Sequence, residues 1–168
     1  MRTPSLFDPI RLGDIPLATR IAMAPLTRNR SPGQVPTPLV AEYYAQRADP
    51  ATGAGLLITE ATPVSPMGHG YIDTPGIHSD EQVRAWRQVT DAVHARGGRI
   101  VCQLWHVGRI SHSSLLPGGA APVSSTAVAS GSRTLVDAGM VPCSTPRALT
   151  TDEVPQVVDE FRRAAVLA

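Results

Sequence analysis

One stretch of the sequence decides the fold, Ile21-Ala22-Met23-Ala24-Pro25-Leu26-Thr27-Arg28-Asn29-Arg30. Its first four residues are apolar and have the length of a short buried strand, whereas the residues after Pro25 carry a hydroxyl and two guanidinium groups. Residues 56–62 and 99–106 repeat this change from an apolar run to polar or aromatic groups. Because ligands bind at the carboxyl ends of parallel strands, the pattern is typical of a parallel α/β enzyme.

Two helices are predicted between these strands. The first begins with a hydroxyl cap and a proline at residues 37–38 and runs to about residue 47. The second begins with a capping box formed by Ser79 and Gln82, and two glycines at residues 97–98 end it. The next strand follows at once, so helix and strand are joined as in a βαβ unit.

A third helix is predicted after the third strand. Thr150 and Glu153 form another capping box ahead of it. Its apolar residues recur at helical spacing and mark one face, formed by Val154, Val157, Val158, Phe161, Ala165 and Leu167. Three strands alternating with three helices predict a parallel α/β fold whose last strand has an open edge, which indicates the front part of a larger structure.

Two further segments lie outside this alternation. Residues 10–17 alternate apolar and polar side chains around Gly13-Asp14, which predicts a small hairpin that acts as a lid or a plug. Residues 105–148 have no long periodic pattern and are rich in Gly, Pro, Ser and Ala. A segment of this length in a compact domain indicates a lid, a binding loop or a small inserted hairpin.

The composition is that of a globular protein. The 168 residues are 42% hydrophobic and 17% charged, with a net charge of +1. This balance argues against nucleic acid or an anionic membrane surface as a partner, because both require a concentrated basic face. No apolar run is long enough for a signal peptide or a membrane span, so we expect a soluble, cytoplasmic protein.

Metal and nucleotide motifs have little support in the sequence. Cys102 and Cys143 lie far apart without metal-type spacing, so free thiols in a reducing compartment are predicted. No metal site is predicted from the histidines, whose spacing does not match a ligand pattern: His69, His78, His94, His106 and His112. There is neither a G-x-G-x-x-G motif nor a P-loop.

Several polar and aromatic residues near the strand ends are open to two interpretations. Thr27 is either a ligand group or a loop hydroxyl that forms a local hydrogen bond. The amide of Gln103 lies in an apolar strand and needs a partner, which a backbone group supplies as well as a ligand does. Tyr71 and Trp105 are either pocket walls or ordinary core or surface aromatic residues.

A set of motifs carries a family resemblance over essentially the whole chain. They are Leu6-Phe7-Asp8-Pro9, Ala22-Met23-Ala24-Pro25-Leu26-Thr27-Arg28, Ile58-Thr59-Glu60-Ala61, Gly70-Tyr71, Pro75-Gly76-Ile77-His78-Ser79, Gln103-Leu104-Trp105-His106-Val107-Gly108-Arg109, Ser111-His112 and Thr145-Pro146-Arg147-Ala148-Leu149. In order and spacing they resemble the old yellow enzymes, in particular the bacterial alkene and N-ethylmaleimide reductases.

The resemblance implies a TIM (β/α)8 barrel that binds FMN at its C-terminal face. NAD(P)H reduces the flavin, and flavin N5 then delivers hydride to an alkene activated by a carbonyl or nitro group, such as an enone or a maleimide. The family's flavin-binding positions match Pro25, Leu26, Thr27, Ala61 and Gln103. Its substrate-pocket aromatic positions match Tyr71 and Trp105.

The resemblance also implies what the chain does not supply. The family holds the substrate oxygen with a His-x-x-Asn or His-x-x-His pair after the fourth strand, where a nearby tyrosine donates the proton, and these positions are expected beyond Ala168. Residues 1–168 are therefore predicted to be the N-terminal part of a single FMN-binding barrel domain, about three βα units, whose partner is the missing C-terminal half. The alternative is a catalytically inactive truncated product or fragment.

Overall fold

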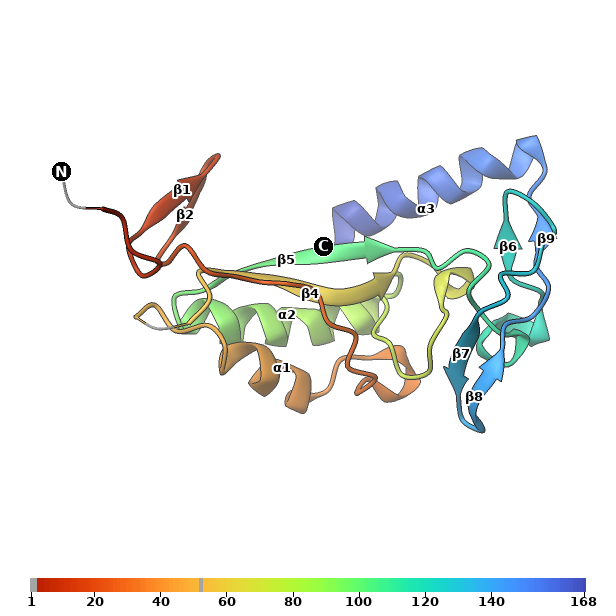
Figure 1. The fold of residues 1–168 in the computed structure, drawn as a ribbon, viewed down its shortest axis with the longest axis horizontal. Helices are drawn as coiled ribbons and strands as arrows, with labels where there is room; N and C mark the ends of the chain where they lie inside the picture. The colour runs from red at the N-terminus through yellow and green to blue at the C-terminus, as the bar shows by residue number, and fades with distance from the viewer. Residues whose placement is uncertain (1–2, 52) are drawn as a thin grey trace.

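A parallel sheet lies at the centre of the molecule. The computed structural model describes residues 3–51 and 53–168. The sheet has three strands in the order β3 (Ala22–Met23), β4 (Leu56–Pro63) and β5 (Arg99–Trp105), and both neighbouring pairs are parallel (Figure 1). The predicted parallel α/β fold is confirmed, and it forms a partial α/β structure without a closed barrel.

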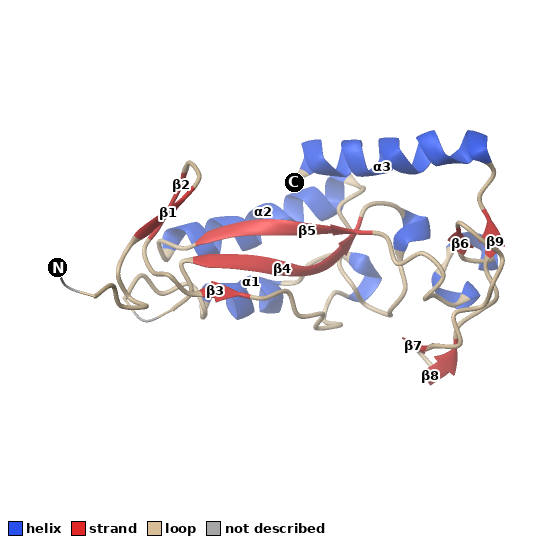
Figure 2. Ribbon diagram, turned by 45° about the horizontal axis from the view of Figure 1, so that its top comes forward, coloured by secondary structure: helices blue, strands red, loops and turns tan. Residues whose placement is uncertain are grey.

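Helices α1 (Pro38–Ala45) and α2 (Asp80–Ala95) cover one face of this sheet, as Figure 2 shows. The predicted capping box of α2 is present, because Ser79 Oγ accepts from Gln82 N–H at 3.3 Å and Gln82 Oε1 accepts from Ser79 N–H at 3.1 Å. Gly97, with φ of +79°, ends α2 as predicted. No helix in the described part of the chain is long and apolar enough to cross a membrane.

Helix α1 begins at Pro38 as predicted, but its end and its capping bond differ from the prediction. The helix ends at Ala45, about two residues early. Thr37 precedes it but makes no side-chain cap, because its hydroxyl donates instead to Arg30 O at 3.3 Å. A tertiary contact with the polar loop after β3 therefore replaces the local capping bond.

The core lies between the sheet and the helices. Tyr44 of α1 and Trp86 of α2 are its largest side chains, and their ring centroids are 6.3 Å apart. The core is formed by Val40, Tyr44, Ala48, Ala54, Leu57, Val64, Ile77, Trp86, Val89, Val93 and Ala164. Trp86, Val89 and Val93 recur at helical spacing and are buried, so this face of α2 meets the core.

Helix α3 (Val154–Leu167) runs beside the edge strand β5, and its predicted apolar face is partly wrong. Ala164 is buried and Phe161 packs against the core, but Val158 is 63% exposed. Residues 157, 161 and 164 form the contact stripe, and Val158 lies about 100° further round the helix than residue 157. Four predicted face residues are exposed: Val154, Val158, Ala165 and Leu167.

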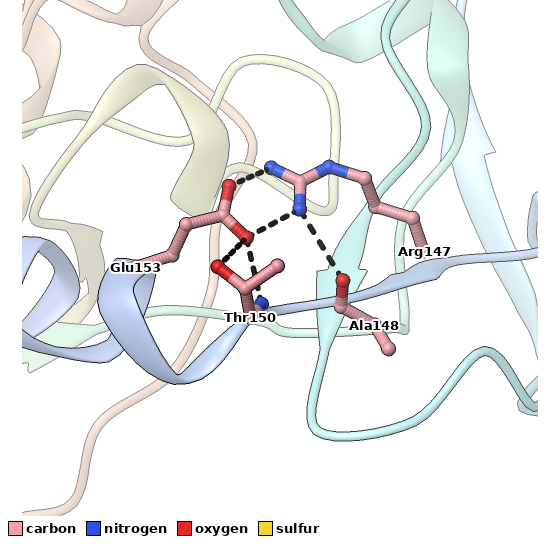
Figure 3. Close-up of polar contacts among 4 residues, drawn as sticks. All are labelled: Arg147, Ala148, Thr150 and Glu153. Carbon is pink, nitrogen blue, oxygen red and sulfur yellow. Dashed lines mark hydrogen bonds and ion pairs between the residues drawn. The ribbon is translucent and has the colours of Figure 1, made fainter.

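A tight corner joins the short strand β9 (Arg147–Ala148) to α3 through the 3-10 turn η5 (Thr151–Glu153). Arg147 donates two hydrogen bonds to Glu153, from Nη1 to Oε2 at 2.7 Å and from Nη2 to Oε1 at 2.6 Å (Figure 3). Glu153 also accepts from Thr150 N–H at 2.8 Å, which confirms the predicted capping box. The hydrogen bonds from Arg147 lower the pKa of Glu153 to about 2.

The predicted N-terminal hairpin is present. Strands β1 (Ile10–Leu12) and β2 (Ile15–Leu17) pair antiparallel around Gly13, whose φ is +58°. The hairpin lies at the amino ends of β4 and β5, opposite their carboxyl tips (Figure 1). It does not cover these tips, and its role as a lid or a plug stays a prediction.

The long irregular segment contains a small inserted hairpin, one of the predicted possibilities. Strands β7 (Arg133–Val136) and β8 (Gly139–Pro142) pair antiparallel, and β6 (Val123–Ser124) pairs with β9. The 3-10 turns are η1 (Pro32–Gln34), η2 (Pro66–Gly68), η3 (Ser113–Leu115) and η4 (Pro117–Gly119). Cys102 and Cys143 are free, as predicted.

Candidate functional site

The carboxyl tips of β3, β4 and β5 bring together the residues predicted to hold a flavin. Ala61 of β4 and Gln103 of β5 are directly paired in the parallel register. The loop that carries Pro25, Leu26 and Thr27 is tied to β4, because the N–H of the next residue, Arg28, donates to Glu60 Oε2 at 2.9 Å. The carboxyl end of the sheet therefore holds all of these positions.

Two polar groups at this edge remain available to a ligand. Gln103 uses its backbone N–H to donate to Thr59 Oγ1 at 2.9 Å. Within residues 3–51 and 53–168, neither its side-chain amide nor the Thr27 hydroxyl makes a hydrogen bond, and both side chains are half-buried. A neutral amide and a hydroxyl offer donors and acceptors without net charge, which fits the polar edge of a neutral ring system such as isoalloxazine.

An aromatic wall stands beside these groups. The rings of Tyr71 and Trp105 are stacked, with centroids 5.8 Å apart and planes 14° apart. Trp105 is two residues beyond Gln103 on β5, and because side chains alternate along a strand, the two residues share one face. The structure thus brings the two predicted substrate-wall residues together, next to Gln103.

The segment that carries Tyr71 is held from several sides. Thr74 Oγ1 donates to Tyr71 O at 3.1 Å, and the side-chain amide of Asn29 donates to Ile72 O. Ile72 N–H in turn donates to Leu135 O of β7 at 3.0 Å. The loop after β3 and the inserted hairpin therefore fix the aromatic wall jointly.

A pair of histidines, one buried and one half-buried, supports the same segment. His69 Nδ1 lies 3.2 Å from Thr74 Oγ1, and His69 Nε2 lies 3.3 Å from His78 Nε2. Burial lowers the pKa of His69 to about 3 and also lowers the pKa of His78, so both rings are neutral near pH 7. In the described residues, no group of three His, Cys, Asp or Glu side chains is placed to hold a metal ion.

Sequence reasoning missed Glu60. Its side chain is 0% exposed, and burial raises its pKa although the N–H groups of Arg28 and Asn29 oppose that change. The signal was present in the sequence, because a carboxylate follows the apolar residues 56–58 inside a strand, where an isolated charge is costly. By contrast, the predicted flavin-binding residue Leu26 is 51% exposed, so the described chain leaves about half of it uncovered.

The geometry defines a class of protein: a parallel α/β segment whose candidate site lies at the carboxyl ends of its strands. Comparison with known proteins is specific. The sequence model of the NADH:flavin oxidoreductase / NADH oxidase family matches residues 5–168. The chain belongs to this family, that of the old yellow enzymes, which confirms the predicted resemblance.

Curated relatives and solved structures agree with this assignment. The putative 12-oxophytodienoate reductase 2 of Oryza sativa subsp. japonica is 51% identical over 160 residues, which are 95% of this chain and 41% of that protein. Morphinone reductase superimposes with a TM-score of 0.90 at 48% identity, covering 98% of this chain and 45% of that one. The old yellow enzyme homologue from Zymomonas mobilis also gives 0.90, at 47% identity, with the same two coverages. The chain therefore spans less than half the length of these relatives.

Proposed function

We propose that this protein is an FMN-dependent oxidoreductase that uses NAD(P)H to reduce alkenes activated by a carbonyl or nitro group. Its family and its similarity to 12-oxophytodienoate reductases support the reaction class. A nicotinamide reductant is supported by the similar structure of morphinone reductase, which was solved in complex with tetrahydroNAD. The groups that hold the substrate oxygen and donate the proton are not assigned to this chain.

In this proposal the strand tips hold the flavin. Thr27 and Gln103 would hydrogen-bond to its polar edge, and the backbone at Pro25 and Leu26 would pass along the ring. Ala61 is small, so the backbone of β4 could approach the ring closely. Bound FMN would supply the two-electron chemistry, because it accepts hydride from NAD(P)H and passes it to the alkene.

The stacked pair Tyr71 and Trp105 would orient the substrate. Two parallel aromatic rings offer a flat apolar surface, which suits an enone or a maleimide. Their place on the same side of β5 as Gln103 would hold such a substrate close to the flavin. The chain's own contribution to the reaction is therefore binding and orientation.

The observation that carries this proposal is the half-buried side-chain amide of Gln103, which makes no hydrogen bond in the described part of the chain, on a residue paired in register with Ala61. We expect the protein purified from its complete gene to bind FMN, and Gln103→Leu to weaken that binding about tenfold through the loss of its hydrogen bonds. The titration follows the quenching of flavin fluorescence. Gln88→Leu, the same exchange at an exposed position of α2, is the control.

Activity provides the second test. The purified protein should oxidise NADPH or NADH faster when cyclohexenone or N-ethylmaleimide is added. A protein that takes up no FMN, or a Gln103→Leu variant that binds FMN as tightly as the wild type, would contradict the proposal. The alternative of an inactive truncated product predicts no acceleration by either alkene.

A further inference from the structure

Strand β4 contains an irregularity at the point where it reaches the candidate site. Ile58 pairs with Val101 and Ala61 pairs with Gln103, so three steps along β4 match two along β5. The extra residue lies within the Thr59-Glu60 step. A bulge of this kind releases a residue from the strand ladder and redirects its side chain, and bulges are frequent next to active sites.

The bulge frees the backbone of Glu60 for other partners. Glu60 N–H donates to the hydroxyl of Tyr44 on α1 at 2.7 Å. Its carbonyl accepts from Thr59 Oγ1 at 2.9 Å and from Thr62 Oγ1 at 2.8 Å. Because Tyr44 is fully buried in the core, this network fixes Glu60 from the helix side as well as from the strand.

The side chain of Glu60 then crosses to the loop after β3. Its Oε2 accepts from Arg28 N–H at 2.9 Å, and the carboxyl group is fully buried. Oε2 can accept this hydrogen bond whether the carboxyl group is ionised or protonated, and burial shields the bond from competing water. This bond acts on the residue directly after Thr27, and Glu60 is the residue directly before Ala61.

We propose that Glu60 is a positioning residue for the flavin. Its carboxyl group fixes the loop after β3, so that the Thr27 hydroxyl stands beside Ala61 and Gln103. Glu60 does not touch the cofactor in this scheme, since it acts through the backbone of Arg28. The inference rests on the proposed function, because it names the device that orders one side of the FMN site.

Three variants of the protein from its complete gene test the proposal. Glu60→Leu removes the acceptor, while Glu60→Gln keeps an oxygen that can accept from Arg28 N–H. Val93→Ala opens a cavity in the buried face of α2 without altering a group of the site, so it reports on lost stability alone. FMN affinity is measured for each well below its unfolding temperature, together with amide exchange at Arg28 in the flavin-free protein.

We expect Glu60→Leu to raise the FMN dissociation constant about tenfold and to speed Arg28 amide exchange by a similar factor. Glu60→Gln should restore both to within about threefold of the wild type. Val93→Ala should lower the unfolding temperature and leave FMN affinity and Arg28 exchange unchanged. A Glu60→Leu protein that binds FMN normally, or a Val93→Ala protein that loses FMN equally, would overturn the proposal.

The exchange measurement separates this inference from the proposed function. A wild-type protein that binds no FMN contradicts the proposed function, and the role of Glu60 toward the flavin falls with it. If the Arg28 amide exchanged slowly in that protein and fast in its Glu60→Leu variant, Glu60 would still be shown to hold the loop. Normal FMN binding with unchanged exchange in Glu60→Leu would overturn the inference alone.

Discussion

Two fully buried titratable side chains, Glu60 and His69, hold the loops around the candidate site. Glu60 ties the loop after β3 to β4, and His69 supports the segment of Tyr71 through Thr74. Burial raises the pKa of Glu60 and lowers that of His69, so in both cases it favours the neutral form. Order at the site is therefore linked to the protonation of groups beneath it.

His69 makes stability depend on pH in a defined direction. Burial, reinforced by the charges of His78 and His106, lowers its pKa to about 3 in the folded protein. The unfolded chain has the ordinary value of about 6.5, so between these values the unfolded state binds a proton that the folded state does not. The free energy of unfolding should therefore fall as the pH drops, by about 2 kcal/mol between pH 7 and pH 5 from this group.

Urea unfolding at several pH values measures this dependence. His69→Gln should flatten the profile between pH 7 and pH 5, with a residual slope from His78 and His106, whose pKa values burial also lowers. His94→Gln, at an exposed position of α2, should leave the profile unchanged. A His69→Gln protein with the slope of the wild type would contradict the assignment.

The elements of the parallel layer meet closely at the start of β4. Gly55 N–H donates to Ile21 O at 2.9 Å, and Gly55 O accepts from Arg99 N–H at 3.1 Å, so this residue joins the beginnings of the three strands. A Cβ atom at Gly55 would lie 2.5 Å from Thr19 O, which is backbone and cannot rotate away. The close approach of the backbone at Thr19 to the start of β4 therefore requires glycine at position 55.

Gly55→Ala should destabilise the fold by about 2 kcal/mol, because the backbone must shift to remove the overlap. The denaturant midpoint measures the effect. Ala51→Gly, an exchange at an exposed position of the same loop, should change the midpoint much less. Equal stability of Gly55→Ala and the wild type would show that the strands can separate at this point without cost.

Elements with a complete local signal were predictable from the sequence. Ser79 with Gln82 and the glycine stop of α2 are local, and they gave both ends of that helix. The face of α3 was not predictable, because the choice between Ala164 and Val158 depends on which side of the helix meets the sheet. A carboxylate inside an apolar strand marked Glu60 as unusual, but the bulge between Ile58 and Ala61 that directs it to Arg28 has no signature in a single sequence.

At the scale of the whole molecule, the strands run from the β1–β2 hairpin to the candidate site, so the hairpin and the site lie at opposite ends (Figure 1). Apolar side chains remain exposed on the edge strand and on α3, for example Val101 at 38% and Val166 at 78%. The sequence predicted this open edge from the alternation of elements. It also predicted that the positions that the family resemblance assigns to the flavin lie together at the strand tips, because ligands bind at the carboxyl ends of parallel strands.

The central claim is that the tips of β3, β4 and β5 form one side of an FMN cradle. A crystal structure of the protein from its complete gene, grown with FMN, tests it most directly. We expect the polar edge of the isoalloxazine within hydrogen-bond distance of the Thr27 hydroxyl and the Gln103 amide, with Ala61 against the ring. Flavin bound away from Gln103 and Thr27, with these side chains still free, would contradict the account.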